Sequence, residues 1–493
     1  MSKVLVIGGG LAGLSAGCYL QLSGFKTEIF EAHSKPGGLL TGWSRNGYNI
    51  DGCIHGFLGS SENHPYYYMW NELLPMDAIQ FIDYEKMYVF MFEDGQEFII
   101  YSDLDRFQEY LLELSAEDKA LIKELVNDTK AIGKLDMSFM IKPRELYGLL
   151  DYISMLRMLP ALRLMRKWNK ITVETFSERI NHPLLRKSVR YFLSPILMHM
   201  FVHSAMDQKV SGYPTIGSLG ISKLLEKKYT EWGGTLHTRS KVNKIIVENN
   251  TAVGLTLQDY SDVKGDIIIS ATDIHSTVYE LLEGKYVDEK LRQAMTKLRL
   301  NSSRLQVSLG VSINSHDIPH SFKIILEEPV NIGSEKHHFI DVLCYNEDTN
   351  AAPAGKSLFI IQIITRDYDY WIDLRATDRV EYARQKKKVA NIVISILEKK
   401  LGSLDGKIEM VDVTTPATYY RYTNNWKGSI QGWDQENLFQ GNPFKKQLSK
   451  LVNFYLAGHW VEPGGGVPTA FKSGRDVAQI ICKKEKKEFM VRM

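Results

Sequence analysis

The sequence predicts an α/β protein in which a Rossmann-like domain is combined with a second, α+β domain. Three observations lead to this fold class. Residues 3–31 read as a strand, a glycine-rich turn, a helix and a second strand, and another glycine-rich stretch stands near the far end of the chain, at residues 464–466. The 493 residues suit two domains or one large interleaved pair.

The glycine-rich turn after the first strand is typical of a dinucleotide site. The glycines have the G-x-G-x-x-G spacing, which permits a tight turn, a close backbone approach to a pyrophosphate and close packing of helix on strand. An acidic residue follows about 20 residues later, where a carboxylate accepts from a ribose hydroxyl. A purely structural turn is the less favoured alternative. The residues expected to contact the dinucleotide here are Gly8, Gly10, Leu11, Ala12, Gly13, Glu31 and Ala32.

Composition excludes several classes of function. The net charge of +2 is too small to indicate nucleic-acid binding. The four cysteines are widely spaced and form no C-x-x-C pair, so neither a metal site nor a disulfide framework is expected. No apolar run approaches 18 residues, the length that a membrane span needs. We expect a cytoplasmic protein and leave membrane association open.

The next segment also favours close contact between backbone and a ligand. Pro36 is followed by Gly37, Gly38 and Leu39, and paired glycines let a chain wrap around a bound group. A surface turn is the alternative. Residues 48–56 then alternate like a strand up to Gly56. His55 in this segment either is a hydrogen-bonded core histidine or faces the cofactor.

Three motifs carry a resemblance to a known family. The stretches GGGLAGLSAG, FEAHSKPGGLLTGW and YNIDGCIHG resemble the flavoprotein superfamily that includes amine oxidases and phytoene desaturases. The C-terminal NFYLAGHWVEPGGGVPTAFKSGRDVAQII is similar to the closing motif of the phytoene desaturase, carotenoid isomerase and retinol saturase group. Two positions depart from the family pattern: Leu39 stands where related flavoproteins often carry arginine, and Ile216 interrupts a Pro-x-Gly-Gly-Ser pattern.

The resemblance implies a fold and a cofactor. FAD is expected to bind non-covalently to a Rossmann-like domain that is interleaved with an α+β substrate domain. The implied FAD-binding parts are residues 1–75, 208–280 and 445–493, and the implied substrate-binding parts are residues 76–207 and 281–444. Val242 would place its main chain against the adenine.

The C-terminal motif predicts a contact with the flavin ring. A strand at 454–457 is aimed at Gly458 and His459, and a helix is expected to start near Pro468, a residue suited to the first helical position. A helix N-terminus at the flavin would stabilise the negative charge of the reduced ring, and the glycines would let the backbone come close. The expected contacts are Gly458, His459, Gly466 and Val467.

Local patterns predict several other elements. Asn249-Asn250 favours a hairpin between strands at 241–247 and 252–257, and Glu93-Asp-Gly95 favours a hairpin over 90–101. Apolar runs predict buried strands at 267–271, 305–311 and 358–364. A lysine-rich helix is expected over 378–400, with its charges on a solvated face.

The expected substrate half contains two unusual segments. Residues 145–168 combine apolar side chains with Arg157, Arg163, Arg166 and Lys167, which is typical of an amphipathic helix at a membrane interface. The alternative is a helix pair, broken at Pro160, that roofs a substrate cavity. Residues 415–433 are rich in tyrosine and tryptophan and are interpreted as a cavity wall rather than core.

These features lead to one main hypothesis and two rivals. The main one is an FAD-dependent oxidoreductase that desaturates, saturates or isomerises carbon–carbon bonds of a hydrophobic isoprenoid or polyene. Because no second G-x-G-x-x-G is present, electrons would pass to or from a quinone, oxygen or an external reductant. Candidate catalytic residues are His55 and Arg421. The rivals are an amine-oxidising flavoprotein and a binding protein that keeps flavin only as structure.

Overall fold

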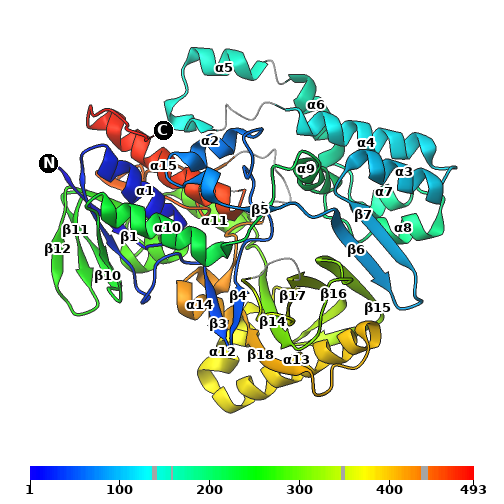
Figure 1. Ribbon diagram of the computed structural model, residues 1–493. Coiled ribbons are helices and arrows are strands. Elements are labelled where there is room, and N and C mark those ends of the chain that lie inside the picture. Colours follow the sequence, from blue (N-terminus) through cyan, green and yellow to red (C-terminus); the bar gives the residue numbers. More distant parts are fainter. Residues whose placement is uncertain (136–140, 157–158, 346–349, 435–441, 463, 493) are drawn as a thin grey trace.

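Two large sheets dominate the part of the chain that the computed structural model describes, residues 1–135, 141–156, 159–345, 350–434, 442–462 and 464–492. In Figure 1 the five-stranded sheet lies with its helices near both chain termini. The seven-stranded sheet lies on the other side of the molecule, with helices α12 (Tyr368–Thr377) and α13 (Arg379–Leu401) below it.

All neighbouring strands of the five-stranded sheet are parallel, which confirms the Rossmann-like prediction. The strand order is β19-β13-β1-β2-β9. The strands are β1 Lys3–Ile7, β2 Lys26–Phe30, β9 Thr235–His237, β13 Ile267–Ser270 and β19 Phe454–Leu456. They come from the N-terminal, middle and C-terminal parts of the chain. Their carboxyl ends therefore bring three distant segments to one edge of the sheet.

Helices from three chain segments pack together beside this sheet. Helix α1 (Leu11–Leu22) contacts both α10 (Gly217–Glu231) and α15 (Gly466–Lys484). Helix α15 comes so close to α1 that a Cβ atom at Gly474 would lie 2.2 Å from the carbonyl oxygen of Ala12. Arg475 of α15 donates to both carboxylate oxygens of Glu72, at 2.6 and 2.7 Å, and Tyr19 of α1 donates to the same carboxylate.

The seven-stranded sheet has the order β18-β14-β17-β16-β15-β6-β7, and only the β15–β6 pair is parallel. One face packs on α12 and α13 around the buried residues Trp371, Val393 and Leu397. The strands are β6 Lys86–Phe92, β7 Glu97–Tyr101, β14 Ser303–Val311, β15 Ser321–Ile332, β16 Glu335–Tyr345, β17 Ser357–Thr365 and β18 Ile408–Thr414.

Shorter strands and further helices complete the described structure. The remaining strands are β3 Gly42–Arg45, β4 Tyr48–Asp51, β5 Phe81–Ile82, β8 Tyr213–Pro214, β10 Val242–Glu248, β11 Thr251–Leu257 and β12 Asp262–Lys264. The remaining α-helices are α2 Pro65–Asn71, α3 Leu104–Leu114, α4 Lys119–Gly133, α5 Leu149–Leu156, α6 Leu159–Asn169, α7 Val173–Ser177, α8 Pro183–Val189, α9 Ile196–Asp207, α11 Glu289–Lys297 and α14 Pro416–Thr423.

The two sheets fall on opposite sides of the expected domain boundaries. Every strand of the five-stranded sheet lies within residues 1–75, 208–280 or 445–493, and every strand of the seven-stranded sheet lies within 76–207 or 281–444. The division into an FAD-binding and a substrate-binding domain itself stays a proposal. None of the described helices combines the length and the apolar composition that a membrane-spanning helix needs.

Most local predictions are confirmed. Strands β10 and β11 form a hairpin in which Asn249 and Asn250 have φ of 48° and 59°. Strands β6 and β7 form the second predicted hairpin, with Gly95 at φ 85°. The three predicted buried strands are β13, β14 and β17, and the lysine-rich helix is α13.

Three local predictions are corrected. The strand expected over 48–56 ends at Asp51, because the Asp51 carboxylate accepts from the backbone N–H of Cys53 and turns the chain. The C-terminal helix begins at Gly466, two residues before Pro468. The aromatic stretch contains the short helix α14, which no pattern predicted.

The tight contact between α1 and α15 predicts the effect of one methyl group. Gly474→Ala should lower the free energy of unfolding by about 1–3 kcal/mol, because the added Cβ overlaps a backbone oxygen of α1 that cannot move independently of its helix. Thermal and chemical unfolding of the flavin-loaded protein would measure the change. Gly148→Ala is the matched control, since its Cβ would lie 3.8 Å from the nearest heavy atom; equal stability of the two variants would contradict the prediction.

Candidate active site

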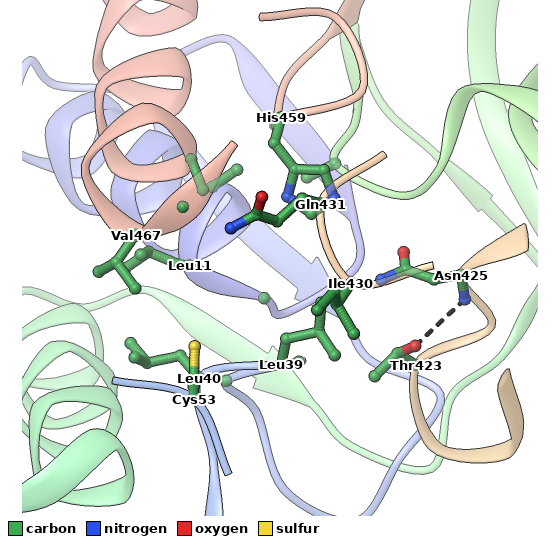
Figure 2. Close-up of a pocket in the computed structure, with 18 of the residues that line it drawn as sticks. Leu11, Leu39, Leu40, Cys53, Thr423, Asn425, Ile430, Gln431, His459 and Val467 are labelled. Carbon is green, nitrogen blue, oxygen red and sulfur yellow. Dashed lines mark hydrogen bonds between the residues drawn. The ribbon is translucent and has the colours of Figure 1, made fainter. Parts of the chain in front are cut away.

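A cavity of about 370 Å³ opens at the carboxyl edge of the five-stranded sheet (Figure 2). This volume lies within the range of ligand pockets, about 300–1,000 Å³. Most of the residues predicted to bind the cofactor line it. These are Gly8, Gly10, Leu11, Ala12, Glu31, Gly37, Gly38, Leu39, Gly458, His459, Gly466 and Val467, and the candidate catalytic residue His55 lines it too.

Four predicted site residues do not line this cavity. Gly13 lies inside α1, where a Cβ atom would be 2.0 Å from the oxygen of Gly8, so its role is packing of helix on strand. Ala32 is exposed. Val242 is buried among the core residues at the start of β10. Arg421 is exposed and stacks on Tyr422, with 4.9 Å between its guanidinium carbon and the ring centre.

The glycine-rich turn and Glu31 form one hydrogen-bonded unit. The backbone N–H of Gly9 donates to Oε2 of Glu31 at 2.7 Å, and the backbone N–H of His33 donates to Oε1 at 2.7 Å. Burial raises the pKa of this carboxyl group, while the two backbone donors lower it. The carboxylate is thus fixed at the cavity wall with lone pairs left for hydroxyl groups of a ligand.

The paired glycines dock directly on this turn. The N–H of Gly37 donates to the oxygen of Gly9 at 2.8 Å, and Gly37 forms a parallel bridge with Gly10. Gly37 and Gly38 have φ of 116° and 60°, a backbone region that side chains disfavour. A Cβ atom at Gly37 would lie 2.5 Å from Oγ of Ser222. The segment after β2 therefore needs glycine to reach the cavity.

The C-terminal motif closes the cavity from the other side. Gly458 has φ of 112° and donates its N–H to Oγ of Ser473 at 2.9 Å, which fixes the chain after β19. Gly466 and Val467, at the first turn of α15, line the cavity, so the N-terminus of this helix opens toward it. Behind the motif, buried Lys446 pairs with Glu462 at 2.6 Å and with Asp476 at 3.3 Å.

His55 stands at the far end of the cavity in a ring of donors. Its Nε2 accepts from Nη1 of Arg304 at 3.2 Å and from Nε2 of Gln362 at 2.8 Å. Because both partners can only donate with these atoms, the proton of the neutral ring belongs on Nδ1, which is buried without a partner. Burial, with smaller contributions from Arg304 and His320, lowers the pKa of His55 from 6.5 to about 3.

A second cavity, of about 330 Å³, meets the first at His55 and Gly56. It lies between β6, the open face of β15–β17 and residues 191–206. Five aromatic side chains line it, namely Tyr84, Tyr88, Phe90, Tyr191 and Phe192, together with Met87 and Met206. Its charged lining residues are Lys86, Lys323 and Asp341, and the last two form an ion pair. An elongated apolar ligand can reach His55 from this side.

The aromatic segment forms the cavity wall only in part. Tyr422 lines the first cavity, as expected, but Trp433 is core, packed on Trp460 and Phe444. The segment contributes polar residues instead, since Thr423, Asn425 and Gln431 line the cavity (Figure 2). Sequence reasoning missed these residues, and also Arg304 and Gln362. The available signal was a charged residue inside the otherwise apolar β14 run.

The first cavity fits a dinucleotide that carries a flavin. Its glycine cradle excludes Cβ atoms, Glu31 presents a carboxylate, and α15 directs its N-terminus inward. Two buried nitrogens without partners, Nδ1 of His55 and Nε2 of His459, supply unused polar groups at the same wall. Within the described ranges, no group of three His, Cys, Asp or Glu side chains could hold a metal ion.

Comparison with known proteins gives a consistent result. A family model described as flavin-containing amine oxidoreductase matches residues 11–482. Similar proteins include a 4,4'-diapophytoene desaturase (4,4'-diapolycopene-forming) from a Methylomonas species, 24% identical over 511 residues that cover 99% of this chain and 96% of the relative. A 4,4'-diaponeurosporene oxygenase from Staphylococcus aureus strain MW2 is 24% identical, with 98% and 99% covered.

Solved structures support the fold. An oxidoreductase from Methanosarcina mazei has a TM-score of 0.58 at 17% identity and covers 97% of this chain and 100% of its own. Putrescine oxidase bound to putrescine has a TM-score of 0.60 at 12% identity, with 98% and 99% covered. At these identities the likeness concerns the fold alone.

The environment of His55 predicts how this residue titrates. Because its folded pKa of about 3 lies below its ordinary 6.5, His55 should remain neutral from pH 8 to pH 4. Nitrogen-15 NMR of labelled protein should show a neutral, Nδ1-protonated ring across this range, with the signal assigned by its loss in His55→Gln.

The same shift has a consequence for stability. Below pH 6.5 the unfolded chain binds a proton that folded His55 does not, so stability falls as the pH drops toward 3. His55→Gln should remove up to about 1.4 kcal/mol of that loss per pH unit. An imidazolium signal for His55 at pH 6 would contradict both statements.

Proposed function

The chain belongs to the family of flavin-containing amine oxidoreductases, and from this premise we propose that it is an FAD-dependent enzyme that desaturates, saturates or isomerises carbon–carbon bonds of a hydrophobic isoprenoid or polyene. Relatives that span nearly its whole length are named as a diapophytoene desaturase and a diaponeurosporene oxygenase. The resemblance drawn from the sequence motifs is thereby confirmed.

The observation that carries the proposal is the meeting of two cavities at His55. One is built from the glycine-rich turn, Glu31 and the start of α15, and the other is walled by aromatic and methionine side chains. Aromatic walls suit a flat, extended polyene, because ring faces pack on conjugated carbon chains and exclude water. A substrate in the second cavity would present a carbon–carbon bond to whatever occupies the first.

The identity of the cofactor as non-covalent FAD has its own support. Glu31 and the glycine-rich turn suit the adenosine and pyrophosphate parts of a dinucleotide. The cysteine that lines the cavity is Cys53, and burial raises the pKa of its thiol to about 12. A thiol that stays protonated is a poor nucleophile and disfavours a thioether link to the ring.

Three side chains at the junction define what the protein contributes. When bound, the flavin supplies the acceptance or donation of a hydride. His55 is neutral at physiological pH and therefore orients and donates a hydrogen bond rather than acting as a general base. Arg304 and Gln362 hold its ring in place. Arg421, the other candidate, is exposed away from both cavities.

The charges of the second cavity argue against the amine-oxidase alternative. An amine substrate is a cation near pH 7, and Lys86 and Lys323 line this cavity against the single carboxylate of Asp341. Arg304 adds a further positive charge at the junction. A cationic substrate would be repelled there, whereas an uncharged polyene would not be.

An anaerobic assay tests the proposed reaction. Oxidised and reduced flavin-loaded protein are incubated separately with a panel of polyenes and isoprenoids, while flavin absorbance and product mass are followed. Desaturation removes two hydrogens from the substrate and bleaches the flavin, saturation adds two and restores the colour, and isomerisation leaves the mass unchanged. Oxygen consumption with amines and none with polyenes would establish the first rival.

The second rival, a structural flavin in a binding protein, has a separate signature. Its flavin would resist dithionite, and no lipid would bleach it without unfolding the protein. If the purified chain could not be loaded with FAD at all, the whole proposal would fail. The electron partner is proposed to be a quinone, oxygen or an external reductant and can be assigned by adding each to the reduced protein.

We also propose that helix α5 contacts a membrane surface, from which a lipid-soluble substrate would enter. Leu149 and Leu150 on α5 are 76% and 80% exposed, and Ile153 is 49% exposed. Arg163 and Arg166 on the neighbouring α6 are exposed, whereas Lys167 pairs with Glu124 and Asp128. Arg157, expected to belong to the same basic face, lies outside the described residues.

The alternative in which these helices roof a substrate cavity has no support in the described residues. Neither α5 nor α6 contributes a described side chain to the lining of the two cavities. In Figure 1, α5 lies at the edge of the molecule, above α2. An exposed apolar helix beside two unpaired-looking arginines on the surface suits an anionic bilayer, because the apolar side chains enter the interface and the cations meet the headgroups.

Liposome sedimentation tests the membrane contact. The protein should bind vesicles of mixed phosphatidylcholine and phosphatidylglycerol, and the double variant Leu149→Ser with Leu150→Ser should bind at least about tenfold more weakly, since it removes two apolar side chains from the interface. Val380→Ser is the control, because Val380 is 82% exposed on α13. Equal binding of the double variant and the control would contradict the proposal.

A further inference from the structure

Arg304 is a buried cation without an acidic partner in the described part of the chain. The residue is 9% exposed, and its Nε has no hydrogen-bond partner. Its guanidinium donates through Nη1 to the neutral ring of His55 at 3.2 Å. No ion pair of Arg304 occurs among the described residues, although arginine is charged at every physiological pH.

The other buried arginine shows how this protein normally treats such a charge. Arg475, 8% exposed, forms two hydrogen bonds to the carboxylate of Glu72, at 2.6 and 2.7 Å. Lys323, also buried, pairs with Asp341. A buried charge that is left unpaired costs several kcal/mol, so Arg304 is expected to meet an anion that the chain itself does not provide.

The surroundings of Arg304 indicate where this anion lies. Arg304 lines the first cavity and not the aromatic one. Two more buried atoms without partners are close in the fold: Oε1 of Gln306, on the same face of β14, and Nδ1 of His55. Such a concentration of unused polar atoms is typical of a ligand site. The guanidinium therefore faces the occupant of the first cavity, at the end that meets the substrate cavity.

We propose that Arg304 stabilises the negative charge that the flavin ring carries after reduction. This inference rests on the proposed function, because it requires a flavin in the first cavity. Two electrons and one proton added to the oxidised ring give it one negative charge. A fixed cation at the end remote from the glycine-rich turn stabilises this reduced form more than the neutral oxidised form.

The consequence is a preferred direction of the reaction. Stabilising the reduced ring raises its midpoint potential and favours withdrawal of two hydrogens from the substrate over their addition. One leaves as a hydride to the ring and the other as a proton to water. Arg304 thus makes desaturation the favoured outcome among the three that the proposed function allows.

The test compares flavin potentials in the absence of substrate. Wild type, Arg304→Met, Arg304→Lys and the control Arg421→Met are loaded with FAD, and their midpoint potentials are measured by dye equilibration. Sulfite affinity is measured in parallel, because sulfite adds to the oxidised ring and leaves a negative charge on it. Arg421 is the matched control because it is exposed and lines neither cavity.

The wild-type potential should lie above that of free FAD. Arg304→Met should weaken sulfite binding by about tenfold or more and lower the potential by at least about 30 mV, the value of a tenfold change for a two-electron couple. Arg304→Lys should keep most of the effect, and Arg421→Met should change neither quantity. A wild-type potential at or below that of free FAD would overturn the proposal even if Arg304→Met failed to fold.

Two other outcomes separate this inference from its neighbours. If Arg304→Met left the potential and sulfite affinity unchanged but weakened binding of a polyene carboxylic acid, the anion would belong to the substrate and the assignment to the flavin would be wrong. If wild type could not be loaded with FAD, the proposed function would fail first. A positioning role through His55 alone would be revealed if His55→Gln lowered the potential as much as Arg304→Met.

Discussion

The absence of a side chain at Gly13 is the constraint on which the site depends. A Cβ atom there would lie 2.0 Å from the carbonyl oxygen of Gly8, so α1 could not start directly against the end of β1. Because it does, the backbone N–H of Gly9 turns toward the end of β2 and donates to Glu31. The same turn offers the oxygen of Gly9 to Gly37. One missing methyl group thus aligns three segments of the cavity wall.

The C-terminal part of the chain extends this arrangement rather than adding a separate unit. Strand β19 pairs with β13, which pairs with β1, so Gly458 emerges beside the glycine-rich turn. The hydrogen bond from Gly458 to Ser473 ties the strand end to α15. Lys446, 2% exposed in its side chain, neutralises Glu462 and Asp476 behind the loop. The position of the α15 N-terminus is therefore fixed by packing from both sides.

The sequence could predict what backbone geometry encodes and could not predict what distant side chains supply. The glycines at 8, 37, 458 and 466 were recognisable because close approach and left-handed φ require glycine. By contrast, His55 meets Arg304 and Gln362, which follow it by 249 and 307 residues. No local pattern can pair such positions. Composition misled for the same reason, since Tyr422 and Trp433 look alike in sequence but one lines the cavity and the other is core.

The chemistry at the junction follows from the protonation of these three side chains. Arg304 and Gln362 both direct donors at Nε2 of His55, so a proton on that nitrogen would remove their acceptor and place two cations in contact. Burial acts in the same direction, and the pKa of His55 falls to about 3. The junction therefore presents donors and one positive charge, and its histidine is no base at neutral pH. Such a site stabilises negative charge that develops in the first cavity and disfavours a cationic substrate in the second, which is the electrostatic pattern expected for hydride withdrawal from an uncharged carbon chain.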